Sequence, residues 1–467
     1  MKHSQDYAGT KVTVMGLGLF GGGAGVSRFF AERGAEVTVT DLRREKDLAL
    51  APLDDLPLRF VLGRHEEADF READLVVANP AVPPTSRFLE VARSAGVRVT
   101  SEVALFLERT RARICAVTGT QGKSSTCNLL TGLLRHSGNA AVLAGNIGGS
   151  LLEKVDLFTE NDVFVLELSS YQLEALALEG QVARRCSAVA ILNILEDHLE
   201  RHGSFENYAA AKRQLLELVQ PGGTVFVPGD SPELALEGPA DAQRVEFSAT
   251  NHRFPLGLDG DVFRWEDESL ATVQDLKLPG EFQRANALVA LGMARAMGVS
   301  TEHLGGALQL CSGLPHRLEN CGHYAGSRVW DNAVSTTPDS TVSAMRALDP
   351  GFTLLVGGQV KNLSLDELAE CAAQRAKLTI CFGAGAESFE RALTAAGAAC
   401  LRTDTVPAAV ELAFDSMTPG DELLFSPAAA SFDAYLNFQV RAADFRIAIR
   451  PKRDPRPSGE SIQEPLA

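Results

Sequence analysis

Residues 116–130 read AVTGTQGKSSTCNLL, a hydrophobic run that passes through a glycine-containing turn into a helix-like segment. Gly119 and Gly122 bracket the turn, and Lys123 follows at once. The common phosphate loop has a glycine five positions before its Gly-Lys pair, where this chain has Val117. Even so, a turn between a strand and a helix directs backbone N–H groups and the helix dipole at one place. The stretch therefore predicts a nucleotide phosphate site in an α/β domain.

The first helical residues after this turn support that interpretation. Lys123 is suited to contact the β- and γ-phosphates, and the hydroxyl of Ser124 can bind Mg²⁺. Helix N-termini normally favour acidic side chains, whereas this one begins with a cation and has no acid in its first turn. A lysine on an ordinary helix N-terminus is the less favoured explanation.

A second glycine-rich turn lies near the N-terminus, in MGLGLFGGGAGVSRFFAERGAEVTVTD. Gly16, Gly18 and Gly21 follow a strand-like run, and Asp41 comes some twenty residues later, as in dinucleotide-binding folds. The extra glycines, Gly22 and Gly23, weaken the match to an NAD site. The turn predicts a nucleotide-binding fold, and a UDP-sugar is as compatible with it as NAD.

Two further stretches carry groups suited to metal and phosphate chemistry. VFVLELSSYQLE places Glu167 at the end of a hydrophobic strand, where phosphoryl-transfer sites hold Mg²⁺. LNILEDHLERHGSFENYAAAKRQLL adds Asp197, His198 and Lys212. Each of these alone is typical of a surface or structural residue. Together with the phosphate turn, they favour contact with metal and substrate.

Three sets of β-branched runs alternate with Ala/Leu-rich segments, which predicts three α/β units. We expect an N-terminal Rossmann-like domain over residues 1–105 and a central phosphate-loop domain with a mainly parallel sheet over 106–312. A C-terminal Rossmann-like α/β domain is expected over 313–450. The polar, proline-containing segment 451–467 predicts a disordered tail.

Composition limits the classes of partner. The 467 residues contain 44 Lys and Arg but 60 Asp and Glu, a net charge of −16, so nucleic acid is not expected to bind. The sequence contains no run of about 18 apolar residues, so we expect no membrane span. The eight cysteines form no C-x-x-C pair, which argues against a zinc site or a disulfide framework and favours a cytoplasmic protein with reduced thiols.

Seven ordered motifs together resemble the Mur ligase family of peptidoglycan synthesis, and within it the branch that adds glutamate. The resemblance runs from about residue 11 to residue 450. The motifs are TGTQGKSS, GNIGGSLL, LELSSYQLE, ILNILEDHLERHGSFENYAAAK, LPGEFQRANALVAL, GLPHRLE and SPAAASFDAYLNFQVRAADF. Members of this family have the shorter phosphate loop, which accounts for Val117.

The resemblance implies roles for individual residues. The UDP-bearing substrate is expected at Gly18, Leu19, Phe20, Asp41, Arg43 and Asn146. ATP is expected at Thr120, Gln121, Gly122, Lys123, Ser124, Ser125, Thr126, Asn286, Arg317 and Asp331. Metal ligands are expected to be Ser124, Glu167, His198 and Lys212, the last as a carbamate. Lys123, Glu167, His198, Lys212 and Arg317 are the expected catalytic groups, and Thr336, Lys361, Ser431 and Phe438 are expected to bind glutamate.

The implied reaction is an ATP-dependent ligation of glutamate to UDP-N-acetylmuramoyl-L-alanine through an acyl phosphate. ATP and Mg²⁺, with two ions, are the implied cofactors, and both substrates are small molecules. Neither nucleic acid nor a membrane is an expected partner, and a monomer is favoured. Folylpolyglutamate-type ligase, inactive nucleotide-binding homologue and NAD oxidoreductase remain as less favoured alternatives.

Two departures from the family pattern bear on specificity. The family's G-x-H-N-x-x-N appears as GEFQRAN, with Phe282 and Gln283 replacing His and Asn. Where glutamate ligases have INDSKATN, this chain has VWDNAVSTTPDST, so the family's Asp falls on Asn332 and its lysine on Val334. Asp331, one residue away, can replace the Asp. The lost lysine favours L-glutamate as the substrate, with D-glutamate as the alternative.

Overall fold

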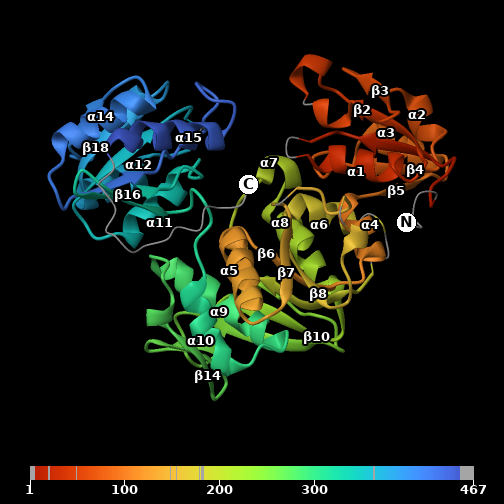
Figure 1. The fold of residues 1–467 in the computed structure, drawn as a ribbon, viewed down its shortest axis with the longest axis horizontal. Helices are drawn as coiled ribbons and strands as arrows, with labels where there is room; N and C mark the ends of the chain where they lie inside the picture. Colours follow the sequence, from red (N-terminus) through yellow and green to blue (C-terminus); the bar gives the residue numbers. More distant parts are fainter. Residues whose placement is uncertain are drawn as a thin grey trace. The chain divides into compact units, whose positions relative to one another are not determined.

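The computed structural model describes residues 6–18, 21–48, 50–147, 149–153, 155–177, 179, 183–360 and 363–452. The chain divides into two compact units, one of residues 1–277 with 282–312, the other of 278–281 with 313–467. Within the described residues, the first unit contains two sheets and the second contains one. The units are described separately below, and Figure 1 labels their elements.

The N-terminal sheet of the first unit is parallel throughout, in the order β3-β2-β1-β4-β5. Its inner strands are β-branched runs with both faces covered, the pattern of a parallel sheet between helices. The strands are β1 (Lys11–Met15), β2 (Glu36–Asp41), β3 (Arg59–Leu62), β4 (Leu75–Ala78) and β5 (Arg98–Thr100). The helices are α1 (Gly22–Ala31), α2 (Glu67–Arg71), α3 (Arg87–Ser94) and α4 (Glu102–Arg109), with 3₁₀ turns at Glu45–Asp47 and Ala51–Leu53.

The second sheet of this unit has the order β14-β13-β12-β11-β10-β9-β6-β8-β7, antiparallel only at β12–β13 and β13–β14. Its strands are β6 (Arg113–Thr118), β7 (Ala140–Gly145), β8 (Asp162–Glu167), β9 (Cys186–Ile191), β10 (Val219–Pro228), β11 (Gln243–Ser248), β12 (Leu256–Asp259), β13 (Val262–Trp265) and β14 (Glu268–Thr272). Its helices are α5 (Lys123–His136), α6 (Ser170–Ala177), α7 (Leu199–His202), α8 (Phe205–Arg213), α9 (Glu281–Ala296) and α10 (Thr301–Leu310). The 3₁₀ turns are Val155–Leu157, Gln214–Leu218, Pro232–Leu234 and Val273–Asp275.

The sheet of the second unit has the order β15-β16-β20-β17-β18-β19 and is parallel except for the β15–β16 hairpin. Its strands are β15 (Glu319–Tyr324), β16 (Ser327–Asp331), β17 (Phe352–Gly357), β18 (Ala376–Phe382), β19 (Cys400–Arg402) and β20 (Glu422–Phe425). Its helices are α11 (Pro338–Ala347), α12 (Asp366–Arg375), α13 (Ala386–Ala395), α14 (Val406–Ser416) and α15 (Phe438–Ile449), followed by a 3₁₀ turn at Arg450–Lys452.

The expected α/β class and the mainly parallel central sheet are confirmed. The boundaries at residues 105, 312 and 450 stay predictions, and residues 453–467 of the expected tail lie outside the described residues. All eight cysteines are free thiols. No helix in the described part of the chain is long and apolar enough to cross a membrane.

Candidate active site

The turn after β6 requires glycine at position 122. Gly122 caps the N-terminus of α5 with a φ of 83°, in the left-handed region that favours glycine. A β-carbon there would lie 2.4 Å from Oδ1 of Asn286, closer than atoms can approach. The first turn of α5 holds no acid, as the sequence predicts. The helix dipole at this end is therefore not neutralised by a side chain of its own first turn.

Asn193, just after β9, fixes the shape of the turn. Its Oδ1 accepts hydrogen bonds from the backbone N–H groups of Thr120, at 3.0 Å, and Gln121, at 2.9 Å. The hydroxyl of Thr120 lies 3.0 Å from that of Tyr208 on α8. The sequence analysis identified neither Asn193 nor Tyr208. Their positions inside the motif ILNILEDHLERHGSFENYAAAK were the available signal.

Two lysines from separate helices converge on one carbonyl of this turn. Nζ of Lys123 donates to the carbonyl oxygens of Gly119 and Thr120, each at 2.9 Å. Nζ of Lys212, on α8, donates to the same Gly119 oxygen at 2.8 Å. Burial, together with the charge of Lys123, lowers the pKa of Lys212 to about 7. The turn therefore concentrates positive charge while holding one amine that readily becomes neutral.

Glu167 ends β8 with only 2% of its surface exposed. Its Oε1 accepts a hydrogen bond from Nδ2 of Asn146 at 2.9 Å. Its Oε2 is buried and has no hydrogen-bond partner among the described residues. A buried carboxylate oxygen without a partner is unfavourable unless a cation or water completes it, and Mg²⁺ prefers such oxygens. Ser124, 5% exposed, contributes a hydroxyl at the start of α5, so the donor set fits Mg²⁺.

His198 lies in the segment before α7 and adopts a left-handed φ of 51°. Its ring contacts Tyr171, with Nδ1 3.5 Å from the tyrosine hydroxyl. Among the residues that the structure describes, no hydrogen bond or ion pair joins His198 to Glu167 or Lys212. Among these three predicted ligands, Glu167 is a buried acid whose charge acts on Lys212, whereas His198 is an exposed imidazole.

The first glycine-rich turn has a different chemistry. Asp41, at the end of β2, accepts hydrogen bonds from the N–H of Leu17 at 3.0 Å and from Nε and Nη2 of Arg43 at 3.1 and 2.8 Å. Burial raises the pKa of Asp41, but the hydrogen bonds from Arg43 and Leu17 outweigh it and hold the pKa below its ordinary value. Arg43 also donates to the Gly18 carbonyl at 3.1 Å. Leu19 and Phe20 lie outside the described residues.

In the altered GEFQRAN motif, the side-chain amide of Asn286 is hydrogen-bonded on both its nitrogen and its oxygen. Nδ2 of Asn286 donates to Oε1 of Gln283 at 3.0 Å, and Oδ1 of Asn286 accepts from the Thr126 hydroxyl at 3.3 Å. Gln283 is 4% exposed, whereas Phe282 is 41% exposed. The predicted ATP residues Thr126 and Asn286 are thus brought together, with Gln283 orienting the asparagine.

In the second unit, the groups expected to bind ATP are engaged within the fold. Oδ1 of Asp331 accepts from the N–H of Ala333 at 2.9 Å, and Oδ2 accepts from Nε of Arg446 at 2.7 Å. Asn332 accepts from the N–H of Leu318 at 3.1 Å and donates to the Ser426 hydroxyl at 3.0 Å. An ATP-binding role for Asp331 stays a prediction. Its hydrogen bonds give it a structural role within the second unit.

The predicted glutamate residues are distributed over this same unit. Thr336 is half-buried, Ser431 is 3% exposed, and Phe438 is the first residue of α15. Lys361 lies outside the described residues. Sequence reasoning missed the fully buried Arg441, whose Nη1 donates to the carbonyls of Gly357 and Ala429 at 3.3 and 3.0 Å. A charged residue inside the C-terminal motif was the available signal.

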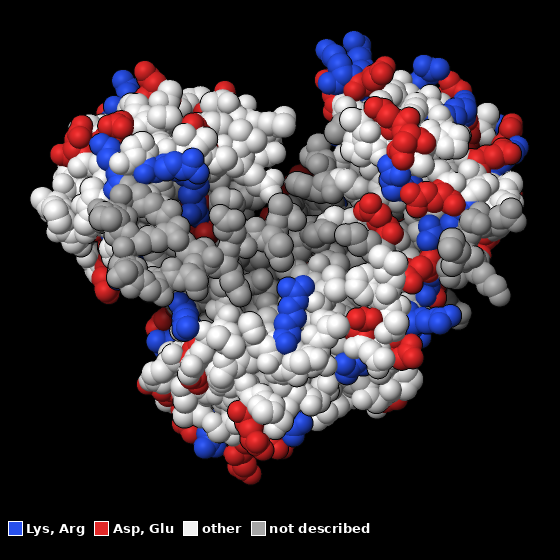
Figure 2. Space-filling model, viewed as in Figure 1, with Lys and Arg blue, Asp and Glu red and all other residues white. Residues whose placement is uncertain are grey.

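On the face shown in Figure 2, blue basic and red acidic side chains of the described residues are interspersed. The net charge of −16 is therefore not concentrated there in one continuous acidic surface. Local groups such as the two lysines at the phosphate turn, and not the net charge, decide which ligands are attracted.

A phosphate turn after a parallel strand, with a strand-end acid beside it, is typical of α/β enzymes that use nucleoside triphosphates. Residues 117–294 match the Mur ligase middle domain, and residues 10–101 match the Mur ligase MurD-like N-terminal domain. The UDP-N-acetylmuramoylalanine–D-glutamate ligase of Roseiflexus sp. (strain RS-1) is 37% identical, covering 94% of this chain and 98% of that protein. The enzyme of the same name from Geotalea uraniireducens is 34% identical, covering 95% and 98%.

Among solved structures, the UDP-N-acetylmuramate-alanine ligase of Thermotoga maritima aligns with a TM-score of 0.63 at 18% identity, covering 95% of this chain and all of that one. A pseudomurein peptide ligase from Methanothermus fervidus aligns with a TM-score of 0.57 at 16% identity, covering 95% and 100%. The chain belongs to the Mur ligase family. It is an ATP-dependent ligase that forms an amide bond and releases ADP, and it acts in peptidoglycan synthesis.

Proposed function

We propose that the chain joins L-glutamate to UDP-N-acetylmuramoyl-L-alanine. The observation that carries the glutamate-adding reaction is identity of 37% and 34%, over nearly the full chain, to relatives named for that reaction. The MurD-like match of residues 10–101 supports the same class of acyl donor, a UDP-bearing substrate. Asp41 and Arg43, which order the first glycine-rich turn, are proposed to shape its site.

The proposed chemistry activates the alanyl carboxylate. A carboxylate oxygen attacks the γ-phosphorus of ATP, ADP departs, and an acyl phosphate forms. The amine of glutamate then attacks the carbonyl carbon, loses a proton, and inorganic phosphate leaves. Lys123 and Arg317 neutralise charge on the transferring phosphate, and the Gly119–Gly122 turn positions it. Lys123 already bends toward this turn, with Nζ 2.9 Å from the Gly119 oxygen.

Mg²⁺, held by Glu167 and Ser124 with His198 as a further ligand, would neutralise phosphate charge and polarise the phosphoryl oxygens. We propose that a second ion depends on Lys212 as a carbamate. The neutral amine attacks CO₂, a nitrogen–carbon bond forms, and a proton is released, which yields an anionic oxygen ligand. The lowered pKa of Lys212, about 7, supports this step because only a neutral amine reacts.

The choice of enantiomer rests on Val334, which stands where glutamate ligases have a lysine. Val334 is half-buried, and its N–H donates to the His316 carbonyl at 3.3 Å. Inversion at Cα redirects the α-carboxylate of glutamate, so a lysine placed for the D form would leave a costly unpaired ammonium with the L form. Valine avoids that cost. D-Glutamate is the second candidate, and the names of the relatives at 37% and 34% identity favour it.

The test is ligation with each pure enantiomer at equal concentration, followed by chromatography of the UDP-linked product. Omission of ATP, UDP-N-acetylmuramoyl-L-alanine or glutamate in turn gives the controls. We expect product only when ATP, UDP-N-acetylmuramoyl-L-alanine and glutamate are all present, and preferentially with the L form. A clear preference for D-glutamate would overturn the enantiomer assignment, and no product with either form would overturn the glutamate-adding reaction. Val334→Lys should weaken use of L-glutamate.

A further inference from the structure

The segment that carries Arg317 has an unusual backbone. His316 and Leu318, on either side of it, adopt positive φ angles of 62° and 47°. Left-handed conformations are uncommon for residues other than glycine because they are unfavourable. They persist only where surrounding contacts stabilise them. Arg317 therefore occupies a turn that depends on neighbouring groups to keep its shape.

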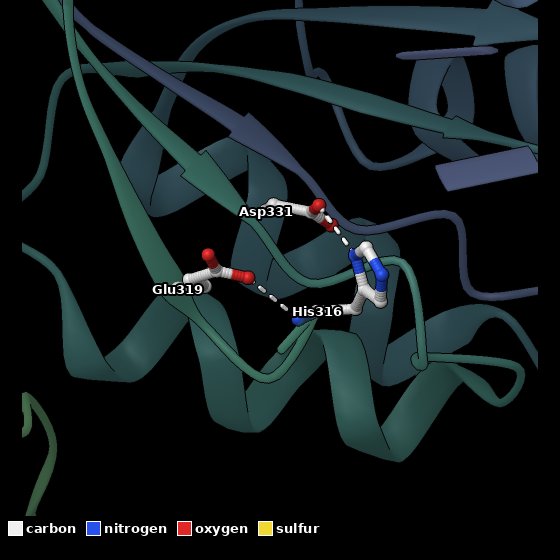
Figure 3. A group of neighbouring side chains, drawn as sticks. All are labelled: His316, Glu319 and Asp331. Carbon is white, nitrogen blue, oxygen red and sulfur yellow. Dashed lines mark hydrogen bonds and ion pairs between the residues drawn. The ribbon is translucent and has the colours of Figure 1, made fainter. Parts of the chain in front are cut away.

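Figure 3 shows how two acids of the β15–β16 hairpin, Glu319 and Asp331, bond to His316 in this turn. Nδ1 of His316 lies 2.8 Å from Oδ2 of Asp331 at the end of β16, and the His316 N–H donates to Oε2 of Glu319 at 2.8 Å. The adjoining backbone is also fixed, since Leu318 donates to the Asn332 side chain at 3.1 Å.

The cluster of His316, Glu319 and Asp331 has the composition of a metal site. Arg446, from α15, already supplies its positive charge. Nε of Arg446 lies 2.7 Å from Oδ2 of Asp331, and Nη2 lies 2.6 Å from Oε2 of Glu319. One planar guanidinium thus bridges both acids, a geometry that lysine, with its single ammonium, cannot reproduce. A metal ion would have to displace this bridge.

Burial favours the protonated form of Asp331, but the hydrogen bond from His316 and the charge of Arg446 outweigh it and lower its pKa. The acid is completely buried and charged. Such a group is stable only while its partners stay in place, because an unpaired buried carboxylate is costly. The bridge therefore connects α15, through Asp331 and Glu319, to His316, the residue before Arg317.

We propose that Arg446 is a positioning residue that, through Asp331, Glu319 and His316, holds Arg317 in the conformation needed to contact the transferring phosphate. This proposal rests on the proposed function, in which Arg317 neutralises phosphate charge. It assigns Asp331 to the support of that arginine. It also links the reaction to α15, whose first residue, Phe438, packs edge-on against His316 with ring centroids 6.4 Å apart.

The test compares Arg446→Ala and Arg446→Lys with wild type in steady-state ligation. Both should lower kcat by about 10- to 100-fold, because a displacement of about 1 Å in a catalytic group costs rates of that order. KM for the UDP-bearing substrate should change less than twofold. Added guanidinium should restore part of the kcat of Arg446→Ala by refilling the bridge, and it should leave Arg446→Lys unchanged.

A double-mutant comparison separates positioning from simple support of the fold. In an Arg317→Lys background, Arg446→Ala should cost about twofold or less in kcat, because the group that it positions is already altered. Arg391→Ala is the matched control, since Arg391 is 76% exposed and its one ion pair among the described residues is with Glu387 on the same helix. Thermal unfolding measures folding for every variant.

The outcomes distinguish the two levels of the account. If wild type forms no product, the proposed function fails before Arg446 is tested. If wild type is active and Arg446→Ala keeps full kcat, the positioning role is wrong. Independent, multiplicative losses in the two arginine variants, without guanidinium rescue, would also contradict the proposal and assign Arg446 to fold stability alone.

Discussion

The two glycine-rich turns of the first unit share a backbone plan and differ in the charges around it. Each joins a parallel strand to a helix, at α1 and α5, and neither helix has an acid in its first turn. At the first turn, Asp41 and Arg43 neutralise each other, with 2.8 Å between charged atoms. At the second, Lys123 and Lys212 share the Gly119 carbonyl.

This difference in charge distinguishes a turn suited to binding a substrate from a turn suited to holding the reacting phosphate. The glycines of both turns let the backbone approach a ligand closely, and that property alone does not distinguish a bound nucleotide from a reacting one. At the second turn, the ammonium of Lys123 can attract a phosphate, while the buried carboxylate of Glu167 and the proposed carbamate of Lys212 can hold metal ions. The balanced pair at the first turn suits a group that is held without being transformed.

The largest expected effect follows from Lys123→Ala. Loss of this ammonium should lower ADP release by about 100-fold or more, because a charge contact on the transferring phosphate is removed. Binding of UDP-N-acetylmuramoyl-L-alanine should remain nearly unchanged, as the first turn is intact. Coupled ADP release and calorimetric titration measure the two properties.

Lys377→Ala is the matched control for Lys123→Ala, because Lys377 is half-exposed and pairs with Asp421. It should leave ADP release at the wild-type rate. Retention of more than about a tenth of wild-type activity by Lys123→Ala would contradict the assignment of the second turn as the reacting one.

A smaller effect is expected from Gly23→Ala at the first turn. The added β-carbon would lie 2.5 Å from the Gly16 carbonyl oxygen, so α1 would have to move away from the turn. The free energy of unfolding should fall by about 1 to 3 kcal/mol. Affinity for the UDP-bearing substrate should fall too, while the ATP-dependent steps at saturating substrate persist.

Gly306→Ala supplies the contrast, since outside its own helix backbone no atom of the described residues lies within 4 Å of a β-carbon at that position. It should stabilise the protein by about 0.5 to 1 kcal/mol, because alanine favours helix more than glycine does. Denaturant unfolding measures both variants. Equal stability of Gly23→Ala and wild type would mean that close packing of α1 on its turn contributes little.

The parallel strands of the fold can be predicted well from the sequence, because buried parallel strands are continuous β-branched runs. The strand-like run before Gly16 and the hydrophobic run before Gly119 are strands as predicted, β1 and β6. The antiparallel ribbon of β12 to β14 was not predicted. Its strands have four, four and five residues and mix exposed polar with buried positions, so their pattern is too short to identify.

Candidate site residues that lie in a sequence motif were easier to predict than residues whose role depends on a contact with a distant part of the chain. Lys123 and Glu167 were predicted from their places at the ends of hydrophobic strands and the turn beside them, and the role of Lys212 from the family resemblance. Arg446 and Asn193 are polar residues whose importance depends on partners 115 and 72 positions away in sequence. A motif contains Asn193 but does not reveal its partners, and no local signal marks Arg446, because only the folded topology brings such pairs together.

The burial of Lys212 predicts an effect on stability that depends on pH. Because its folded pKa, about 7, lies below the ordinary value of 10.5, the unfolded chain binds more protons between these values. The free energy of unfolding therefore rises with pH through this window. In CO₂-depleted buffer, Lys212→Met should stabilise the protein by about 1 to 3 kcal/mol at pH 6 and by less at pH 10.

Denaturant unfolding at the two pH values measures the difference, with Lys377→Met as the exposed control. A gain from Lys212→Met that does not change with pH would mean that the lysine is not held at a lowered pKa. In that case the carbamate would lose its main physical support, and the two cations of the second turn would be equivalent.

The most direct test of the central claim follows oxygen through the reaction. UDP-N-acetylmuramoyl-L-alanine carrying ¹⁸O in both carboxylate oxygens is ligated to glutamate with ATP, and the released phosphate is examined by mass spectrometry. Activation as an acyl phosphate predicts one ¹⁸O in each inorganic phosphate and one in the new amide carbonyl. Phosphate without ¹⁸O, formed together with the amide product, would contradict the account, because the carboxylate would then have been activated without phosphorylation.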